Sequence, residues 1–231
     1  MKRLATILAL CVMSATSVFA QKEVEEEKPS IEREASDEIT SLQTAYALAK
    51  YGYANNSASA LIGAAEILAQ VPTQKLDVSA EQQGTKADNE KTASESGYTA
   101  EKLLEDGKKL VGKNKTLAKW ISEVERLVKK SGTRGAVGGP KYQYSWAYGY
   151  NGTTRFIVPF YANRPAEIYI DSVDWADLDL YVYDSNWNLV ARDTSYDLDC
   201  YVCFYPRRTE RFYVIIKNTS RWDSCFQILT N

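Results

Sequence analysis

The sequence contains no histidine among its 231 residues. Histidine is the usual general base near neutral pH and the commonest side-chain metal ligand. Its absence excludes Ser-His-Asp and Cys-His catalytic centres and all imidazole metal sites. No glycine-rich phosphate-binding motif follows a predicted strand either. We therefore expect a protein that is not an enzyme, although a hydrolase that works with two carboxylates is a class that the residue types still allow.

Long apolar segments are also scarce. Lys2 and Arg3 precede an apolar run over residues 4–13, and Val-Phe-Ala at residues 18–20 fits a cleavage site. This pattern predicts a cleavable signal peptide over residues 1–20, which exports the protein to the periplasm or the medium. The apolar run is shorter than the roughly 20 residues that a membrane helix needs, and no later segment reaches that length, so we expect no membrane span.

Acidic residues dominate the start of the predicted mature chain, which begins at Gln21. We expect residues 21–30 to form a disordered acidic leader, because they hold too little apolar surface to pack. Removing the two basic residues of the signal peptide leaves 26 basic against 30 acidic residues, a net charge of about −4. A mildly acidic chain is a poor ligand for nucleic acid, so we expect no nucleic-acid partner.

The composition of the chain changes at Pro140. Ala, Lys, Glu and Leu, which favour helices, dominate before it, whereas Tyr, Asp, Val and Ile, most of which favour strands or turns, dominate after it. Four glycines within residues 131–140 predict a flexible linker. We therefore predict an α-then-β protein of two domains, with a helical domain over residues 31–130 and a β-sandwich over residues 141–231.

Apolar residues of the first domain recur at three- and four-residue spacing and predict a helical hairpin over residues 31–70, broken at residues 55–57. The small residues of this hairpin resemble those of a single tetratricopeptide unit. After a polar linker over residues 73–97, a second helical pair is predicted over residues 99–110 and 115–129. The apolar stripes of the four helices form either a core or a groove for a partner's peptide.

Period-two alternation in the second domain predicts about eight short strands separated by turns, as in a β-sandwich. The clearest cases are residues 166–171 and 178–183, where apolar residues alternate with polar residues or tyrosines. Each such strand is expected to bury one side and to leave the other side in water.

Three segments of this domain resemble a known family. They are Asp177-Leu-Asp-Leu-Tyr-Val-Tyr-Asp184, the following Ser-Asn-Trp-Asn-Leu-Val190, and Arg211-Phe-Tyr-Val-Ile-Ile-Lys217. Together they resemble the bacterial pre-peptidase C-terminal domain, over residues 141–231. The resemblance implies a jelly-roll-like antiparallel β-sandwich that accompanies secreted peptidases and other exported proteins, aids secretion or substrate attachment, and is not catalytic. The layout also resembles that of exported bacterial proteins with helices before this module, although Trp187 stands where family members often have a turn glycine.

Aspartates near the predicted strand ends raise a calcium hypothesis, because Ca²⁺ takes six to eight oxygen ligands. The predicted ligands are Asp177, Asp179, Asp197 and Asp199. The alternative is that these are ordinary solvated carboxylates, since no EF-hand spacing is present.

Loss of the signal peptide removes one of the four cysteines and leaves Cys200, Cys203 and Cys225. An oxidising compartment favours disulfides, and three thiols can form only one within the chain. By strand parity Cys200 faces the core, whereas Cys203 and Cys225 face outward. We therefore predict a Cys203–Cys225 disulfide, provided that the two strands lie close together, with Cys200 buried as a thiol.

Aromatic residues supply the predicted binding site. Trp187 and Trp222 lie in predicted turns, where an exposed indole can stack on a sugar ring or anchor a protein partner; the alternative for each is that the ring packs internally. The row of aromatic residues within 142–150 is expected to pack internally. We therefore predict a non-catalytic exported binding or envelope-associated module that contacts a protein or glycan surface. The alternative is an accessory protein that assembles with partners through its helical hairpins.

Overall fold

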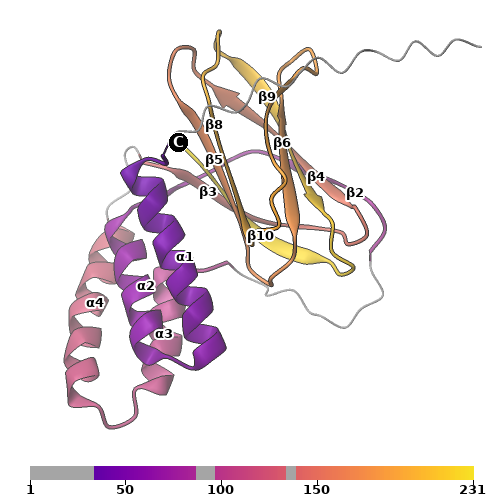
Figure 1. Cartoon of the computed structure of the whole chain (residues 1–231). Coiled ribbons are helices and arrows are strands. Elements are labelled where there is room, and N and C mark those ends of the chain that lie inside the picture. The colour runs from indigo at the N-terminus through magenta and orange to yellow at the C-terminus, as the bar shows by residue number, and fades with distance from the viewer. Residues whose placement is uncertain (1–33, 87–96, 134–138) are drawn as a thin grey trace, which may run out of the picture.

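The structure of the chain, a computed structural model, describes residues 34–86, 97–133 and 139–231 (Figure 1). Its helices are α1 (Asp37–Asn55), α2 (Ala58–Gln70), α3 (Ala100–Leu110) and α4 (Lys115–Thr133). Its strands are β1 (Gln74–Lys75), β2 (Ala80–Gln83), β3 (Lys141–Ala147), β4 (Thr153–Phe160), β5 (Ala166–Ser172), β6 (Leu178–Tyr183), β7 (Leu189–Asp193), β8 (Asp199–Phe204), β9 (Glu210–Asn218) and β10 (Ser224–Thr230). The predicted signal peptide, the acidic leader and the middle of the glycine-rich linker lie outside the described residues.

The four helices form where the apolar periodicity predicts them. α1 ends at Asn56, whose left-handed φ of 49° lets its N–H donate to the Gly52 carbonyl. The hydroxyl of Ser57 then accepts from the N–H of Ala60 and caps α2. A Cβ on Gly52 would lie 2.5 Å from Leu61 Cδ2, so the two helices of the hairpin approach closely at a glycine. No helix in the described part of the chain has both the length and the apolar character to cross a membrane.

The strands form two five-stranded sheets that face each other (Figure 1). Sheet A has the strand order β1-β3-β10-β5-β8, and sheet B has the order β2-β4-β9-β6-β7. The pairings are antiparallel except for the parallel pair β1–β3. Most neighbours in each sheet are not consecutive in the chain, because the chain crosses from one sheet to the other, as in a jelly-roll-like sandwich.

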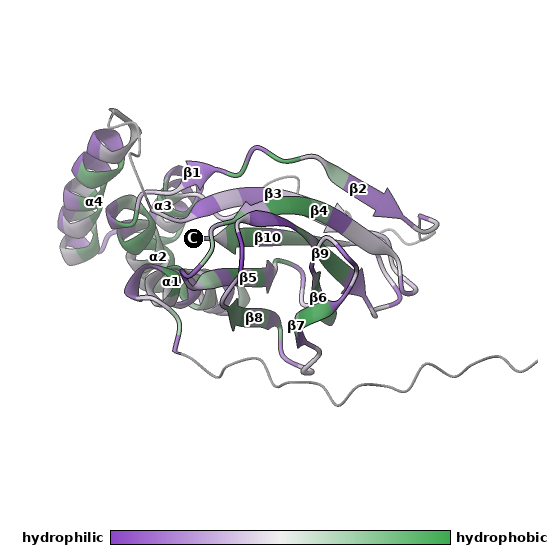
Figure 2. Cartoon of the chain, turned by 90° about the horizontal axis from the view of Figure 1, so that it is seen from above, coloured by the Kyte–Doolittle hydropathy of each residue, from purple (hydrophilic) through white to green (hydrophobic). Residues whose placement is uncertain are grey.

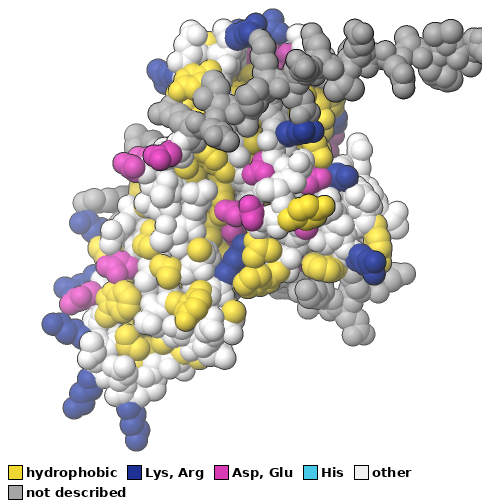
Figure 3. Space-filling model, viewed as in Figure 1, with side chains coloured by type: hydrophobic (Ala, Val, Ile, Leu, Met, Phe, Trp, Pro, Cys, Tyr) yellow, Lys and Arg dark blue, Asp and Glu magenta, His cyan; other side chains and the backbone are white. Residues whose placement is uncertain are grey.

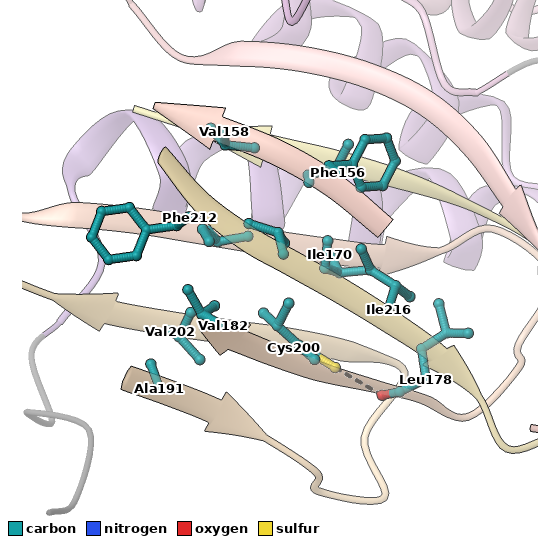
Figure 4. Packing of buried hydrophobic residues seen from close by; sticks show 14 of the residues in the cluster. Phe156, Val158, Ile170, Leu178, Val182, Ala191, Cys200, Val202, Phe212 and Ile216 are labelled. Carbon is teal, nitrogen blue, oxygen red and sulfur yellow. Dashed lines mark hydrogen bonds between the residues drawn. The ribbon is translucent and has the colours of Figure 1, made fainter. Parts of the chain in front are cut away.

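The core of the sandwich lies between the two sheets (Figure 4). Phe156 of β4 and Phe212 of β9 are almost completely buried there, and Phe156 meets Phe226 edge to face with 6.2 Å between ring centroids. Cys200 belongs to the same core, where its thiol donates to the Leu178 carbonyl over 2.8 Å. Burying each large apolar side chain contributes roughly 1.5–3 kcal/mol before the loss of conformational entropy is subtracted.

The segment predicted as a polar linker, residues 73–97, contains two strands. β1 pairs with β3 and β2 pairs with β4, so the segment runs along the sandwich and adds an edge strand to each sheet (Figure 2). Leu76, between these strands, is buried in the sandwich core. The linker prediction is therefore wrong for residues 74–83, because backbone hydrogen bonds, which need no apolar side chains, hold a polar segment in the sheet.

The helices cover the outer face of sheet A (Figures 1 and 2). The prediction of one wet side is therefore wrong for β5: Glu167, Tyr169 and Asp171 are on the helix-facing side and are at most 4% exposed. Tyr169 and Leu229 belong to the same apolar cluster as the helices. The α-then-β arrangement is as predicted, but the helices and the sandwich pack against each other.

The outer face of sheet B carries none of the described helices (Figure 2). Here the alternation of β6 is as predicted, with Leu178, Leu180 and Val182 buried in the core and the intervening residues partly exposed. This uncovered face and the turns at its ends are the surfaces of the sandwich that a partner can reach.

Candidate binding surfaces

A buried ion pair joins the helical layer to sheet A. Lys50 Nζ of α1 lies 2.8 Å from Asp171 Oδ1 of β5, and the two side chains are 9% and 2% exposed. The hydroxyl of Tyr169 donates to the same carboxylate over 3.3 Å. Burial raises the pKa of Asp171 to about 6, and the charge of Lys50 limits the rise. Because the pair is closed to solvent, it holds the two layers together and presents nothing to a ligand.

A cavity of about 280 Å³ lies between the helices and β3. Its lining residues are Leu42, Tyr46, Leu68, Val71, Pro72, Thr73, Tyr98, Thr99, Ala100, Glu101, Ser131 and Tyr142. This volume is slightly below the range of roughly 300–1,000 Å³ that is usual for ligand pockets. Among the residues that the structure describes, Glu101 is the one acid in this lining, so the described lining holds no carboxylate pair of the kind that a glycosidase needs.

Trp187 lies in the β6–β7 turn, which spans residues 184–188. The carboxylate of Asp184 accepts hydrogen bonds from the N–H groups of Asn186 and Asn188 and from the Asn188 side-chain amide. Partial burial alone would raise the pKa of Asp184, but the bonds from Asn188 and Asn186 lower it overall. Trp187 has a φ of 63°, a left-handed conformation that suits glycine and strains a tryptophan.

The indole of Trp187 lies flat on the ring of Tyr213 in β9. The ring centroids are 4.3 Å apart and the planes differ by 9°. The ring centroid of Tyr183 lies 5.8 Å from that of Trp187, and the Arg155 guanidinium lies 5.7 Å from the ring centroid of Tyr213. Trp187 is nevertheless 50% exposed. The stack therefore holds one face of the indole in a defined orientation and leaves much of the ring in solvent.

The sequence analysis missed Tyr213, although a signal for it was present. Tyr213 alternates with the core residues Phe212 and Val214, so its parity places it on the outer face of sheet B. The pairing of β6 with β9 puts Tyr183 directly opposite Tyr213. Only this pairing, which is long-range, brings the turn aromatic over a strand tyrosine.

Trp222 is different from Trp187. It is only partly exposed and packs against the sandwich core, so it follows the second of the two alternatives, internal packing. The aromatic row within residues 142–150 packs as predicted in its first half, where Tyr142 and Tyr144 contact the helix-facing cluster. At the end of the row Tyr150 is 67% exposed.

The four aspartates predicted to bind calcium are spread over both sheets and a loop. Asp177 and Asp179 lie at the start of β6 in sheet B, whereas Asp199 begins β8 in sheet A. Asp177 accepts from the Thr219 hydroxyl. Across the described ranges, no three His, Cys, Asp or Glu side chains gather so that they could hold a metal ion. The predicted ligands, Asp177, Asp179, Asp197 and Asp199, therefore do not form a preformed calcium site.

Cys200, Cys203 and Cys225 are buried thiols. Their parity is as predicted: Cys200 lies in the sandwich core, whereas Cys203 and Cys225 lie on the other side of sheet A. The predicted Cys203–Cys225 disulfide is wrong, because β5 runs between their strands. In the sheet register Cys203 of β8 lies opposite Glu167 of β5, and the Cys225 carbonyl accepts a hydrogen bond from the N–H of Val173. These partners are six positions apart along the chain, which separates the two cysteines by roughly 20 Å, far beyond the roughly 7 Å that a disulfide spans.

The apolar stripes of the helices are used inside the protein. Leu42 and Tyr46 of α1, Leu61 of α2 and Leu103 of α3 are buried together in one cluster with residues of sheet A. On the face drawn in Figure 3, Lys and Arg side chains project from the outer edge and the free end of the helical layer. The stripes thus form a core, the first of the two predicted alternatives.

No protein-family model matches the sequence, and no curated protein matches it. One similar solved structure is the pre-peptidase C-terminal domain of a collagenase from Bacillus anthracis, with 9% identity and a TM-score of 0.36 over 41% of this chain and 91% of that chain. Another is a mitogen derived from Yersinia pseudotuberculosis, with 18% identity and a TM-score of 0.32 over 41% of this chain and 86% of that chain. Both similarities are of low identity and cover less than half of this chain.

Proposed function

We propose that this protein is an exported, non-catalytic binding protein of the bacterial envelope or its surroundings, and that it contacts a glycan through the outer face of sheet B. Trp187 and Tyr213 form the centre of the contact. A flat indole held by a second ring is a suitable platform for the apolar face of a sugar, which stacks on aromatic rings.

The half-exposed indole of Trp187, stacked on Tyr213, is the observation that carries this proposal, and the strained backbone of Trp187 adds to it. A φ of 63° in a bulky residue costs of order 1–3 kcal/mol, and glycine would avoid that cost. Such strain is typical of functional positions, where the side chain is kept for what it contacts. Stacking on Tyr213 offsets part of the strain, but stacking alone does not require half of the indole to stay in water.

Two features of the sequence support export without catalysis. The pattern over residues 1–20 is that of a signal peptide, and the chain has no histidine to act as a general base. The described lining of the cavity beside the helices holds one acid, Glu101, and no second acid beside it. A binding role needs neither a cleft nor a general base, and an uncovered sheet face meets its requirements.

The experiment is a co-sedimentation assay with the mature chain, residues 21–231, and a panel of insoluble glycans: peptidoglycan sacculi, chitin and cellulose. We expect retention on at least one member of the panel, and a loss of roughly tenfold or more in affinity for Trp187→Gly, because the stacking surface is gone. Glycine accepts the left-handed backbone, so this variant should fold normally.

Trp175→Gly is the matched control. Trp175 is 52% exposed with a φ of 67°, almost the same as Trp187, but it lies in the β5–β6 turn at the opposite end of the sandwich. Retention that survives Trp175→Gly and is lost in Trp187→Gly supports the proposed face. Retention that is lost only in Trp175→Gly would move the site to the other end, and no retention on any glycan would remove the glycan proposal.

A further inference from the structure

The two ends of the sandwich differ in charge. One end carries the loops 148–152, 173–177, 194–198 and 219–223, whose charged residues are Asp174, Asp177, Asp197, Arg221 and Asp223. The other end carries the loops 161–165, 184–188 and 205–209 and the start of β9. Its charged residues are Arg164, Asp184, Arg207, Arg208, Glu210 and Arg211. An acidic protein therefore concentrates arginine at one end of its sandwich, and this is the end that holds Trp187.

Both acids at the arginine-rich end are already engaged. Asp184 accepts three hydrogen bonds within its own turn. Glu210 accepts from Arg208 over 3.0 Å and from the Ser185 hydroxyl, and these bonds lower its pKa. Both acids therefore stay ionised and occupied. Neither Asp184 nor Glu210 forms an ion pair with Arg207 or Arg211.

Arg164, Arg207 and Arg211 form no ion pair with any residue that the structure describes, and all three are exposed. Arg211 lies on the outer face of sheet B two positions before Tyr213. Arginine presents a planar fork that binds a carboxylate through two hydrogen bonds, and it is weakly hydrated compared with lysine. These guanidinium groups therefore remain available to an anion from outside.

Exposed aromatic rings accompany the arginines. Tyr161 is 66% exposed and lies 6.0 Å below the Arg164 guanidinium, and Tyr205 is 43% exposed. The loops that carry them are tied together, since the N–H of Asn163 donates to the Pro206 carbonyl. Figure 3 shows Lys and Arg side chains beside hydrophobic ones at the uppermost end of the sandwich. Exposed rings and guanidinium groups are therefore both present at this end of the sandwich and on its adjoining face.

We propose that this arginine–aromatic end, comprising Tyr161, Arg164, Trp187, Tyr205, Arg207 and Arg211, binds an acidic polysaccharide. The proposal rests on the function proposed above and names its ligand class. Sugar rings stack on Trp187 and the exposed tyrosines, while the carboxylate groups of successive sugars pair with the arginines. Charge complementarity favours such a ligand at this end, because the loops at the opposite end of the sandwich carry mainly aspartates.

The experiment compares polygalacturonate with its fully methyl-esterified form, which has the same sugar rings without the charge. Binding of the mature chain is measured by affinity gel electrophoresis at low and high salt. We expect polygalacturonate to bind roughly tenfold or more tightly than the ester at low salt, and this preference to shrink at high salt as the charges are screened.

Three variants locate the effect. Arg207→Gln combined with Arg211→Gln should weaken binding of polygalacturonate by roughly tenfold and leave binding of the ester unchanged. Trp187→Gly should weaken the binding of both polymers equally. Arg126→Gln combined with Lys129→Gln, which removes the same two charges from exposed positions on α4, is the matched control and should change neither. An unchanged melting temperature confirms that each variant is folded.

The outcomes separate the two proposals. Equal binding of both polymers, with loss of both in Trp187→Gly, would overturn the acidic ligand and leave the glycan platform standing. Absence of binding to these polymers and to every insoluble glycan of the earlier panel would overturn both proposals. A single-stranded DNA oligonucleotide that binds as tightly as polygalacturonate would show unselective attraction of polyanions and would also overturn the acidic-polysaccharide assignment.

Discussion

Lys50 Nζ lies 2.8 Å from Asp171 Oδ1, and this contact is the ion pair by which helix α1 is fastened to strand β5. Taking two charges out of water is costly, and the cost is repaid only while both partners are present. Asp199 pairs with Asp171 in the sheet register and adds a like charge, which makes the cation of Lys50 more necessary. The pair therefore ties the stability of the helical layer to one lysine.

Replacing Lys50 with methionine should lower the free energy of unfolding by about 3–5 kcal/mol at neutral pH, because it leaves the Asp171 carboxylate buried without a cation. Urea unfolding followed by circular dichroism measures the change. Lys109→Met is the control: its pair with Asp106 is also 2.8 Å long, but Lys109 is 64% exposed, so the cost should be far smaller than for the buried pair. Equal costs for the two variants would contradict a structural role for the buried pair.

The buried carboxylate also predicts a pH dependence. The pKa of Asp171 is about 6 in the folded protein and 3.8 as the reference value, so between these values the folded state binds more protons than the unfolded state. The contribution of Asp171 to stability is therefore full below about pH 4 and is lost as the pH rises through about 6, a change of roughly 3 kcal/mol.

Asp171→Asn isolates this effect, because asparagine cannot lose a proton. We expect the stability of the wild type, measured relative to Asp171→Asn by urea unfolding, to fall as the pH is raised from 4 to 7. Titrating groups remote from Asp171 are common to both proteins and cancel in the difference. A difference that is constant over this range, or that changes in the opposite direction, would show that the pKa of Asp171 is not raised.

The three buried thiols predict resistance to a thiol reagent. Burial raises the pKa of Cys200 and Cys225, and the thiolate is the reactive form. The folded chain of residues 21–231 should therefore react slowly with Ellman's reagent, and its three thiols should all react after unfolding in denaturant without reductant. A single reactive thiol after unfolding would instead reveal a disulfide between two of the cysteines.

Calcium should leave the stability of the mature protein unchanged. An ion that binds only the folded state raises the melting temperature by mass action. We expect no such rise, because the four candidate aspartates do not converge on one site. Thermal unfolding with excess EDTA and then with millimolar calcium measures this directly. A rise of several degrees with calcium, abolished in Asp177→Asn or Asp199→Asn, would establish a site that assembles only when the ion is present.

Local patterns were enough to predict much of this protein. Apolar spacing predicted the four helices, and the asparagines and serine at residues 55–57 predicted where the first hairpin turns. Alternation predicted which residues of β6 and β9 face the core and on which side each cysteine lies. The turn at Trp187 was also readable, because Asp184 and Asn188 are residues that stabilise tight turns. All of these features depend on residues close together in the chain.

The tertiary structure decided the rest, because a period of two distinguishes the sides of a strand but does not say what covers each side. Only packing placed α1 over Glu167, Tyr169 and Asp171 and so excluded water from that side of β5. Backbone pairing, which leaves little trace in composition, drew residues 74–83 into both sheets and set β5 between the strands of Cys203 and Cys225. The same long-range pairing stacked Trp187 on Tyr213 and brought arginines from separate loops to one end of the sandwich. Composition alone, by contrast, excluded any chemistry that needs a histidine side chain.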